Sequence, residues 1–278
     1  MPRTVFSIPF SKYSGAGNDF AIVAEPDARM MPADALARLI CPRTTGVGVD
    51  GFILVQRLAS DRVAARFFNP DGSEFSTCGN GTRCVARFAR HRGLTPASSM
   101  DVETAGGVVR AVLREEGVAL DFELDARIEG TLSVPVGGDT ADGWRVRIGT
   151  PHLVVPIARM PDGDIRPLAE PIRFHPELGP EGTNVDFVAR HGRSDATIRT
   201  YERGVEGETL ACGSGAMAAA LVLHRAGLTG ETVRLHTRSG EDLRVTLLDA
   251  GAAEGSLQRI RLEGPARRIF DGEYPVVG

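Results

Sequence analysis

Residues 78–95 read CGNGTRCVARFARHRGLT, and residues 212–229 read CGSGAMAAALVLHRAGLT. Both stretches begin with C-G-x-G, and both carry a G-L-T whose glycine lies 15 residues after the cysteine, at Gly93 and Gly227. Each stretch is followed by a T-x-x-G turn between strand-like runs. The pattern indicates one α/β unit that the chain uses twice.

The repeated stretch predicts a helix with defined ends. The glycines of C-G-x-G allow close backbone approach and leave N–H groups pointing out of a first helical turn. Gly93 and Gly227 suit the position just after a helix. The second helix, AMAAALVL, is apolar on nearly every face and is predicted to be buried inside a sheet. The first helix carries Arg83, Arg87 and Arg90, so we expect it to be buried less completely.

Short strands separated by Gly and Pro surround these helices, for example RVAARFF, VALDFEL, WRVRIG and ATIRTYER. The predicted fold class is α/β of the α+β type. It has two pseudo-symmetric halves, each a mixed sheet wrapped around a central helix, with the active site in the cleft between them. We expect the N-terminal half at residues 1–122, with residues 267–278 returning to it as a strand, and the C-terminal half at 123–266.

The composition excludes several classes of protein. The chain has 278 residues, 42% of them hydrophobic and 24% charged, with a net charge of −4. These values are typical of a globular protein, and they give no basic surface for nucleic acid. No apolar run approaches the length of a membrane span, and the first 20 residues lack the apolar core of a signal peptide. We therefore expect a cytoplasmic protein whose four cysteines are free thiols.

The sequence also argues against cofactor and metal chemistry. Lys12 is the only lysine, and its place near the N terminus is a poor one for the Schiff base of a pyridoxal phosphate enzyme. There is no C-x-x-C or H-x-x-x-H pair to bind a metal, and no phosphate-binding G-x-x-x-x-G-K loop. We expect no cofactor and no metal, with the chemistry carried by side chains alone.

Cys78 and Cys212 each open one of the two helices. A helix N terminus stabilises a thiolate and offers an anion site that suits a carboxylate. A thiolate on one side of a carbon and a thiol on the other can remove a proton and deliver one to the opposite face, which is racemisation or epimerisation without a cofactor. The simpler interpretation is two small buried residues, and a redox-active thiol pair is a further alternative. Cys84 and Cys41 are predicted to be a core residue and a packed turn residue.

These residues resemble the diaminopimelate epimerase family almost from end to end. The matching stretches are SGAGNDF at 14–20, TGVGVDG at 45–51, FNPDGSE at 68–74, CGNGTRC at 78–84, GTPH at 149–152, GTNVDFV at 182–188, YERGVEGET at 201–209 and ACGSGA at 211–216. The resemblance implies conversion of LL-2,6-diaminopimelate to the meso form, in lysine and peptidoglycan precursor synthesis. It also implies a homodimer that binds its small-molecule substrate and has no other partner.

The resemblance assigns roles to the matched positions. Cys78 and Cys212 become the acid/base pair, and His152 and Glu202 lie near the thiols and tune their pKa. The residues that bind the carboxylate of the reacting centre are Asn18, Gly79, Asn80, Gly213 and Ser214. The residues that bind the distant amino acid centre are Asn69, Asn184, Glu202 and Arg203. Because that centre is a zwitterion, the adjacent Glu202 and Arg203 supply an acceptor for its ammonium and a cation for its carboxylate.

Ordinary structural roles for these residues, and two positions that differ from the family's pattern, leave alternatives open. Glu202 and Arg203 could form a solvated surface pair, His152 could be a loop histidine, and Asn69 and Asn18 could be turn or cap residues. The family often has Gln where this chain has Gly51, and Asn where it has Thr150. Gly51 is therefore left out of the predicted site, while Thr150 can still donate a hydrogen bond. The alternative functions are a racemase of another amino acid, of the histidine or hydroxyproline type, and a non-catalytic relative, against which both cysteines argue.

Overall fold

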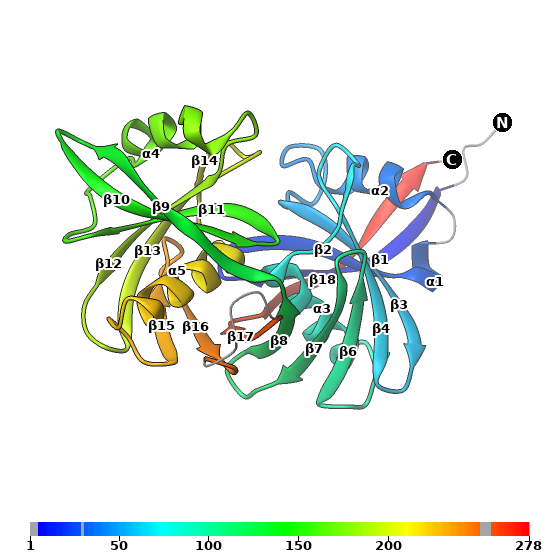
Figure 1. Ribbon diagram of the computed structural model, residues 1–278. Coiled ribbons are helices and arrows are strands. Elements are labelled where there is room, and N and C mark those ends of the chain that lie inside the picture. The colour runs from blue at the N-terminus through cyan, green and yellow to red at the C-terminus, as the bar shows by residue number, and fades with distance from the viewer. Residues whose placement is uncertain (1–4, 29–30, 251–256, 278) are drawn as a thin grey trace. The chain divides into compact units, whose positions relative to one another are not determined.

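The structure is a computed structural model that describes residues 5–28, 31–250 and 257–277 (Figure 1). Residues 1–4 and 278, at the ends of the predicted N-terminal half and its returning segment, lie outside the described residues, as do residues 29–30 and 251–256. The first 20 residues, in which we expect no signal peptide, therefore lie only partly within the described residues. The chain divides into unit 1, Met1–Leu120 with Gly264–Gly278, and unit 2, Asp121–Glu263.

In its described residues, unit 1 is a mixed sheet with three helices. Its strands are β1 (Val5–Gly15), β2 (Asn18–Ala24), β3 (Gly51–Ala59), β4 (Arg62–Phe68), β5 (Glu74–Phe75), β6 (Ser99–Thr104), β7 (Gly107–Leu113) and β18 (Arg267–Val277). Its helices are α1 (Glu25–Ala28), α2 (Ala33–Ile40) and α3 (Gly79–His91). The C-terminal strand β18 runs antiparallel to β1. The chain leaves this unit within β8 (Val118–Leu124) and returns at the end of β17 (Gln258–Gly264).

Unit 2 is likewise a mixed sheet with helices. Its strands before β17 are β9 (Ala126–Val136), β10 (Asp139–Ile148), β11 (Thr150–Ile157), β12 (Asn184–Arg190), β13 (Asp195–Glu202), β14 (Gly207–Thr209), β15 (Thr232–His236) and β16 (Asp242–Leu247). Its helices are α4 (Arg166–Arg173), the short 3-10 helix η1 (Pro176–Leu178) and α5 (Gly213–Arg225).

The strand pairing confirms the internal repeat. In unit 1, β1–β2 is antiparallel, β2–β3 parallel and β3–β4 antiparallel. Strand β4 then pairs antiparallel with β5 and parallel with β6, which pairs antiparallel with β7. In unit 2, strands β10 to β16 repeat every one of these pairings in the same order. The prediction of two similar α+β halves is therefore confirmed.

The predicted helix ends are also confirmed. Cys78 and Cys212 are the N-caps of α3 and α5. Gly93 and Gly227, just beyond the C-caps, have φ of 68° and 69°, a conformation that glycine adopts without strain. Helix α3 contacts strands β1 to β4, β6, β7 and β18, and α5 contacts β10 to β13, β15 and β16. Each helix thus lies among the strands of its own unit (Figure 1).

The expectation that α3 is less buried than α5 is wrong. Helix α3 is buried along most of its length, and Arg83 on it is 0% exposed. The guanidinium of Arg83 donates from Nε to the carbonyl of Pro265 (3.1 Å) and from Nη2 to Asn80 Oδ1 (2.8 Å). These hydrogen bonds offset the free-energy cost of burying the guanidinium charge. Composition alone does not reveal that such partners exist.

A further hydrophobic core covers the face of each sheet that points away from the central helix. In unit 2, Ile165, Ala169 and Ile172 of the α4 region pack against Val185 and Phe187 of β12. Since side chains alternate between the two faces of a strand, Asn184 and Asp186 face the other way, toward α5. Helix α2 covers the corresponding face of unit 1. This alternation decides which polar side chains reach the start of each central helix.

Candidate active site

The two cysteines occupy the same local position. Cys78 and Cys212 have extended backbone, with φ/ψ of −150°/115° and −116°/115°, and their side chains cap the helices that follow. Each sulfur accepts a hydrogen bond from the backbone N–H three residues on, at Gly81 and Gly215, over 3.4 Å. The other backbone N–H groups of the first helical turn point out of the helix start.

The second glycine of each C-G-x-G lets a strand side chain lie against the helix start. A Cβ on Gly81 would lie 2.8 Å from the ring of Phe67, and a Cβ on Gly215 would overlap Asp186 Oδ1 and lie 3.2 Å from Thr200 Oγ1. The motif is therefore a packing requirement as well as a cap. In unit 2 the group that it admits is a carboxylate.

We expect Gly215→Ala to destabilise the protein by about 1–3 kcal/mol, the usual cost of overpacking. Alanine favours a helix by about 1 kcal/mol over glycine, but the added methyl meets a carboxylate that two hydrogen bonds hold in place. Urea unfolding measures the change. The control is Gly230→Ala, where an added Cβ has no heavy atom within 4 Å. An equal effect in both variants would show that Asp186 moves aside freely.

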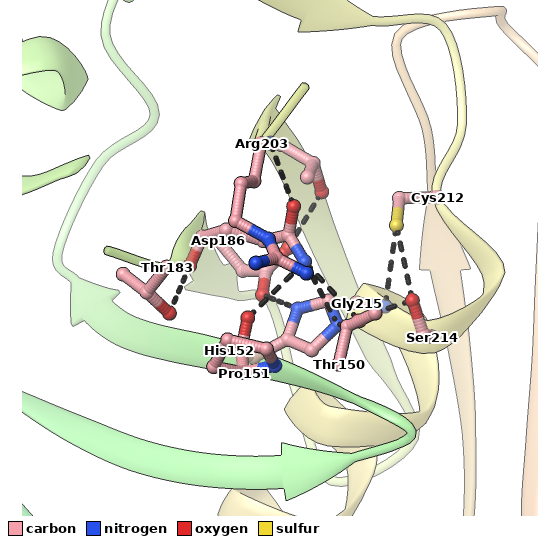
Figure 2. A network of polar contacts seen from close by, with 11 residues as sticks. Thr150, Pro151, His152, Thr183, Asp186, Arg203, Cys212, Ser214 and Gly215 are labelled. Carbon is pink, nitrogen blue, oxygen red and sulfur yellow. Dashed lines mark hydrogen bonds and ion pairs between the residues drawn. The ribbon is translucent and has the colours of Figure 1, made fainter. Parts of the chain in front are cut away.

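A buried polar network surrounds the start of α5 (Figure 2). Asp186, 0% exposed, accepts hydrogen bonds from Thr200 Oγ1 and lies within hydrogen-bond distance of His152 Nδ1, each at 2.7 Å. The other ring nitrogen of His152, Nε2, lies 3.0 Å from Ser214 Oγ and 3.1 Å from Thr150 Oγ1. The Ser214 hydroxyl is in turn 3.4 Å from Cys212 Sγ. A chain of hydrogen-bond contacts therefore runs from the Cys212 thiol through Ser214 and His152 to the buried carboxylate of Asp186.

Asn184 joins this network to Arg203. The Asn184 side-chain amide donates to the carbonyl of Pro151 (3.1 Å) and to Thr150 Oγ1 (3.3 Å), and its oxygen accepts the backbone N–H of Arg203 (2.8 Å). The guanidinium of Arg203 pairs with Glu181 at 3.0 Å. The structure thus connects six of the predicted site residues in one network: Thr150, His152, Asn184, Arg203, Cys212 and Ser214.

The charge state of Cys212 differs from the expectation for a helix N terminus. Burial raises the pKa of the Cys212 thiol well above its usual value, and the Glu202 and Asp186 carboxylates add to the rise. Hydrogen bonds with Ser214 and Gly215 oppose it. Burial also raises the pKa of Glu202, and the neighbouring Thr209 hydroxyl opposes the rise. Burial and the two carboxylates outweigh these hydrogen bonds and favour the protonated form of Cys212.

In unit 1, the predicted residue Asn18 lies beside Cys78. Cys78 Sγ lies 3.9 Å from Asn18 Oδ1, within the range of a weak sulfur hydrogen bond. The Asn18 amide donates to Asp50 Oδ2 at 2.8 Å, and Asp50 pairs with Arg43 at 2.6 Å. Asp50 and Arg43 therefore hold Asn18 in its orientation beside the thiol.

The side chains of Asn69 and Asn80 have local partners. Asn69 follows β4 in a tight turn, where its amide donates to Ser73 Oγ at 3.0 Å. Asn80 is 5% exposed, and its oxygen accepts from Arg83. Because the Asn80 side chain is engaged with Arg83, the backbone N–H of Asn80 is the group that fits the role predicted for this residue at the helix start. Asn69 has the turn character that its NPDG context suggests.

Strand register shows that the site residues correspond in pairs between the units. The pairings Phe20↔Gly51 in β2–β3 and His152↔Asn184 in β11–β12 occupy the same place in the repeat. Counting from them, Asn18 corresponds to Thr150 and Asn69 to Glu202. Gly51 corresponds to Asn184, and a Cβ on Gly51 would lie 3.2 Å from the Phe20 ring and the Phe68 carbonyl. The lack of a side chain at Gly51 thus fits its tight surroundings.

Asp186, Thr200 and Asp50 are polar residues of these networks that the sequence analysis did not select. Asp186 lies in GTNVDFV, where it is the one charged residue and stands between the apolar Val185 and Phe187. A carboxylate in such a run signals a buried, partnered group. That signal was available in the sequence, whereas the partners of the carboxylate were not.

Within residues 5–28, 31–250 and 257–277, no group of three or more His, Cys, Asp or Glu side chains could hold a metal ion. No helix in the part of the chain that the structure describes has the length and apolar character needed to cross a membrane.

Comparison with known proteins gives consistent matches. The family described as "Diaminopimelate epimerase" matches residues 10–125 and 145–266. The diaminopimelate epimerase of Aquifex aeolicus is 36% identical over 277 residues, covering 95% of this chain and 96% of that protein. The diaminopimelate epimerase of Archaeoglobus fulgidus is 38% identical over 280 residues, covering 95% of each.

Solved structures share the fold at low identity. A probable proline racemase from Agrobacterium radiobacter K84 matches with a TM-score of 0.70 and 15% identity, over 98% of this chain and 93% of that one. A hydroxyproline epimerase from Agrobacterium vitis matches with a TM-score of 0.68 and 16% identity, over 98% and 92%. At these identities the likeness establishes the fold alone.

Proposed function

Because the chain belongs to the diaminopimelate epimerase family, we propose that its reaction uses Cys78 and Cys212 as the two proton-transfer groups. That reaction is the PLP-independent interconversion of LL- and meso-2,6-diaminopimelate, a step of lysine biosynthesis. One observation carries the proposal: each thiol caps the central helix of its unit, at the same point of a repeated topology.

In the proposed steps, the α-carbon of the substrate loses one proton and gains one proton. In the LL-to-meso direction, the Cys78 thiolate removes the α-proton, and the electron pair of the C–H bond passes to the α-carboxylate. The Cys212 thiol then gives its proton to the opposite face of that carbon. Cys78 ends as the thiol and Cys212 as the thiolate, which is the starting state for the reverse direction. The raised pKa of the buried Cys212 thiol supports its role as the donor.

The helix starts supply the site for the reacting carboxylate in this proposal. The backbone N–H groups of Gly79, Asn80, Gly213 and Ser214 belong to the first turns of α3 and α5, which attract anions. Delocalising the carbanion increases the negative charge on the carboxylate oxygens, so these donors bind the transition state better than the substrate. Asn18, beside Cys78, helps to hold the same end.

The distal amino acid centre is bound by Asn69, Asn184, Glu202 and Arg203. Arg203 takes the distal carboxylate, exchanging its exposed partner Glu181 for the substrate. Glu202 takes the distal ammonium. Burial raises the pKa of Glu202 in the free protein, and a bound ammonium lowers it again, so substrate binding favours the ionised form. His152 tunes the neighbouring thiol through Ser214.

The cell compartment and assembly complete the proposal. The mechanism needs reduced thiols, and the four cysteines are free in the structure, which favours a reducing compartment such as the cytoplasm. The net charge of −4 gives no electrostatic attraction to nucleic acid. We propose a homodimer, with no partner other than the substrate and a second copy. Sedimentation velocity measures the assembly state.

Incubation with LL-diaminopimelate in deuterated water tests the function. We expect meso product that carries solvent deuterium at the inverted carbon, while unreacted LL substrate recovered early stays largely unlabelled. That asymmetry is the signature of two separate proton carriers. Chiral chromatography with mass detection measures both. Turnover of histidine or proline derivatives in preference to diaminopimelate would contradict the substrate, and equal labelling of substrate and product would contradict the two-thiol mechanism.

A further inference from the structure

The strands behind the two cysteines carry opposite chemistry at matched positions. Register identifies the positions: His152 lies beside Asn184, and Asp186, two residues on, pairs with Thr200. In unit 1, Phe20 lies beside Gly51, and Ile53, two residues on, pairs with Phe67. A polar trio in unit 2 thus replaces an apolar trio in unit 1.

Contacts at the helix starts confirm this correspondence independently of register. A Cβ on Gly81 would meet the side chains of Phe67 and Ile53, at 2.8 and 3.3 Å. A Cβ on Gly215 would meet the side chains of Asp186 and Thr200. Two members of each trio therefore lie against the same turn of the helix that its cysteine caps. Phe20, Ile53 and Phe67 have no side-chain group that can form a hydrogen bond, whereas every member of the unit 2 trio does.

The hydrogen bonds of the unit 2 trio have one direction. A carboxylate only accepts, so the contact of Asp186 Oδ2 with His152 Nδ1 places the proton on Nδ1. In the neutral ring, Nε2 is then an acceptor, and Ser214 Oγ at 3.0 Å donates to it. The same hydroxyl accepts from the Cys212 thiol across 3.4 Å. Thr200 donates to Asp186 Oδ1 and fixes the carboxylate.

We propose that Asp186 is a positioning residue for the half-reaction of Cys212, acting through His152 and Ser214, while Cys78 works against an apolar wall. When Cys212 gives its proton to the substrate, the Ser214 hydroxyl turns from His152 Nε2 to the new thiolate. The Thr150 hydroxyl, 3.1 Å from Nε2, takes its place on the imidazole. Only hydrogen-bond partners change, and no further proton leaves or enters. This inference rests on the proposed function, since it presupposes proton transfer by both thiols.

Asp186→Asn tests the proposal because it removes the charge and keeps the size of the side chain. We expect kcat to fall about 10²-fold, as for loss of acid–base assistance, with KM changed less than about threefold. Because the Cys212 step becomes slower than the Cys78 step, we expect the α-deuterium isotope effect to rise in the meso-to-LL direction. In the LL-to-meso direction the solvent isotope effect should rise and the α-deuterium effect should fall.

Two further variants keep the test independent of folding. Thr200→Val removes one hydrogen bond to Asp186 and should show the same isotope pattern with a loss of about tenfold in kcat. Thr229→Val, a buried threonine beyond the end of α5, is the matched control and should leave kcat and the isotope effects unchanged. Thermal unfolding is measured for each. If Asp186→Asn does not fold, the isotope pattern of Thr200→Val decides the matter.

The outcomes separate this inference from the proposed function. A wild-type protein that does not epimerise LL-diaminopimelate refutes the function. An active wild type, with Asp186→Asn and Thr200→Val indistinguishable from Thr229→Val, overturns the role of Asp186 and leaves the function intact. A fall in kcat with isotope effects that change alike in both directions also overturns it, because a merely structural role predicts that result.

Discussion

Replacing either Cys78 or Cys212 with alanine is expected to lower epimerase turnover by at least about 10³-fold, while the fold persists. Inversion needs one group to take a proton and another to give one, and alanine does neither. Each variant also loses a sulfur cap on a helix, which costs about 0.5–2 kcal/mol. Chiral analysis of turnover, with circular dichroism for the fold, measures both effects.

The chain offers two matched controls for this result. Cys84 is 0% exposed on α3, and Cys41 is 1% exposed at the end of α2, and neither opens a central helix. Cys84→Ala and Cys41→Ala should keep turnover within about twofold, with modest losses of stability from the small cavities. Near-normal turnover in either Cys78→Ala or Cys212→Ala would refute the two-thiol mechanism.

Arg203→Ala is expected to raise the activation free energy that governs kcat/KM for LL-diaminopimelate by about 2–5 kcal/mol, which lowers kcat/KM by about 30- to 5,000-fold. The distal carboxylate loses a charge-assisted and geometrically specific partner. Stability should change by less than about 1 kcal/mol. The reason is that Glu181, the partner of Arg203 in the free protein, is 81% exposed, and exposed ion pairs contribute little. The backbone bond from Arg203 to Asn184 survives the substitution.

Glu181→Gln is the control for this prediction. It removes the ion pair without touching the guanidinium, so kcat/KM should stay within about twofold of wild type. Amino acids with a single centre, such as alanine or lysine, should be poor substrates of the wild type because they leave Glu202 and Arg203 without partners. An Arg203→Ala variant with unchanged kcat/KM would place the distal carboxylate elsewhere.

Local signals made much of the fold predictable. The strands RVAARFF and VALDFEL are β4 and β8, and both central helices begin and end where their cysteines and glycines indicate. Caps and positive-φ glycines act within a few residues along the chain, so their effect does not depend on tertiary structure. The burial of Arg83 was not predictable, because its carbonyl partner at Pro265 is 182 residues away.

By itself, the sequence determined that the chain repeats one unit, that each unit opens its central helix with a cysteine, and which family it resembles. Only the tertiary structure decided what lies behind each cysteine. His152 and Asp186 are 34 residues apart, and Asn18 and Cys78 are 60 apart. Such partners meet through strand register and through the alternation of side chains across a sheet, which no local pattern records. Register places equivalent strand positions behind the two helix starts, and the side chains at those positions are polar behind Cys212 and apolar behind Cys78.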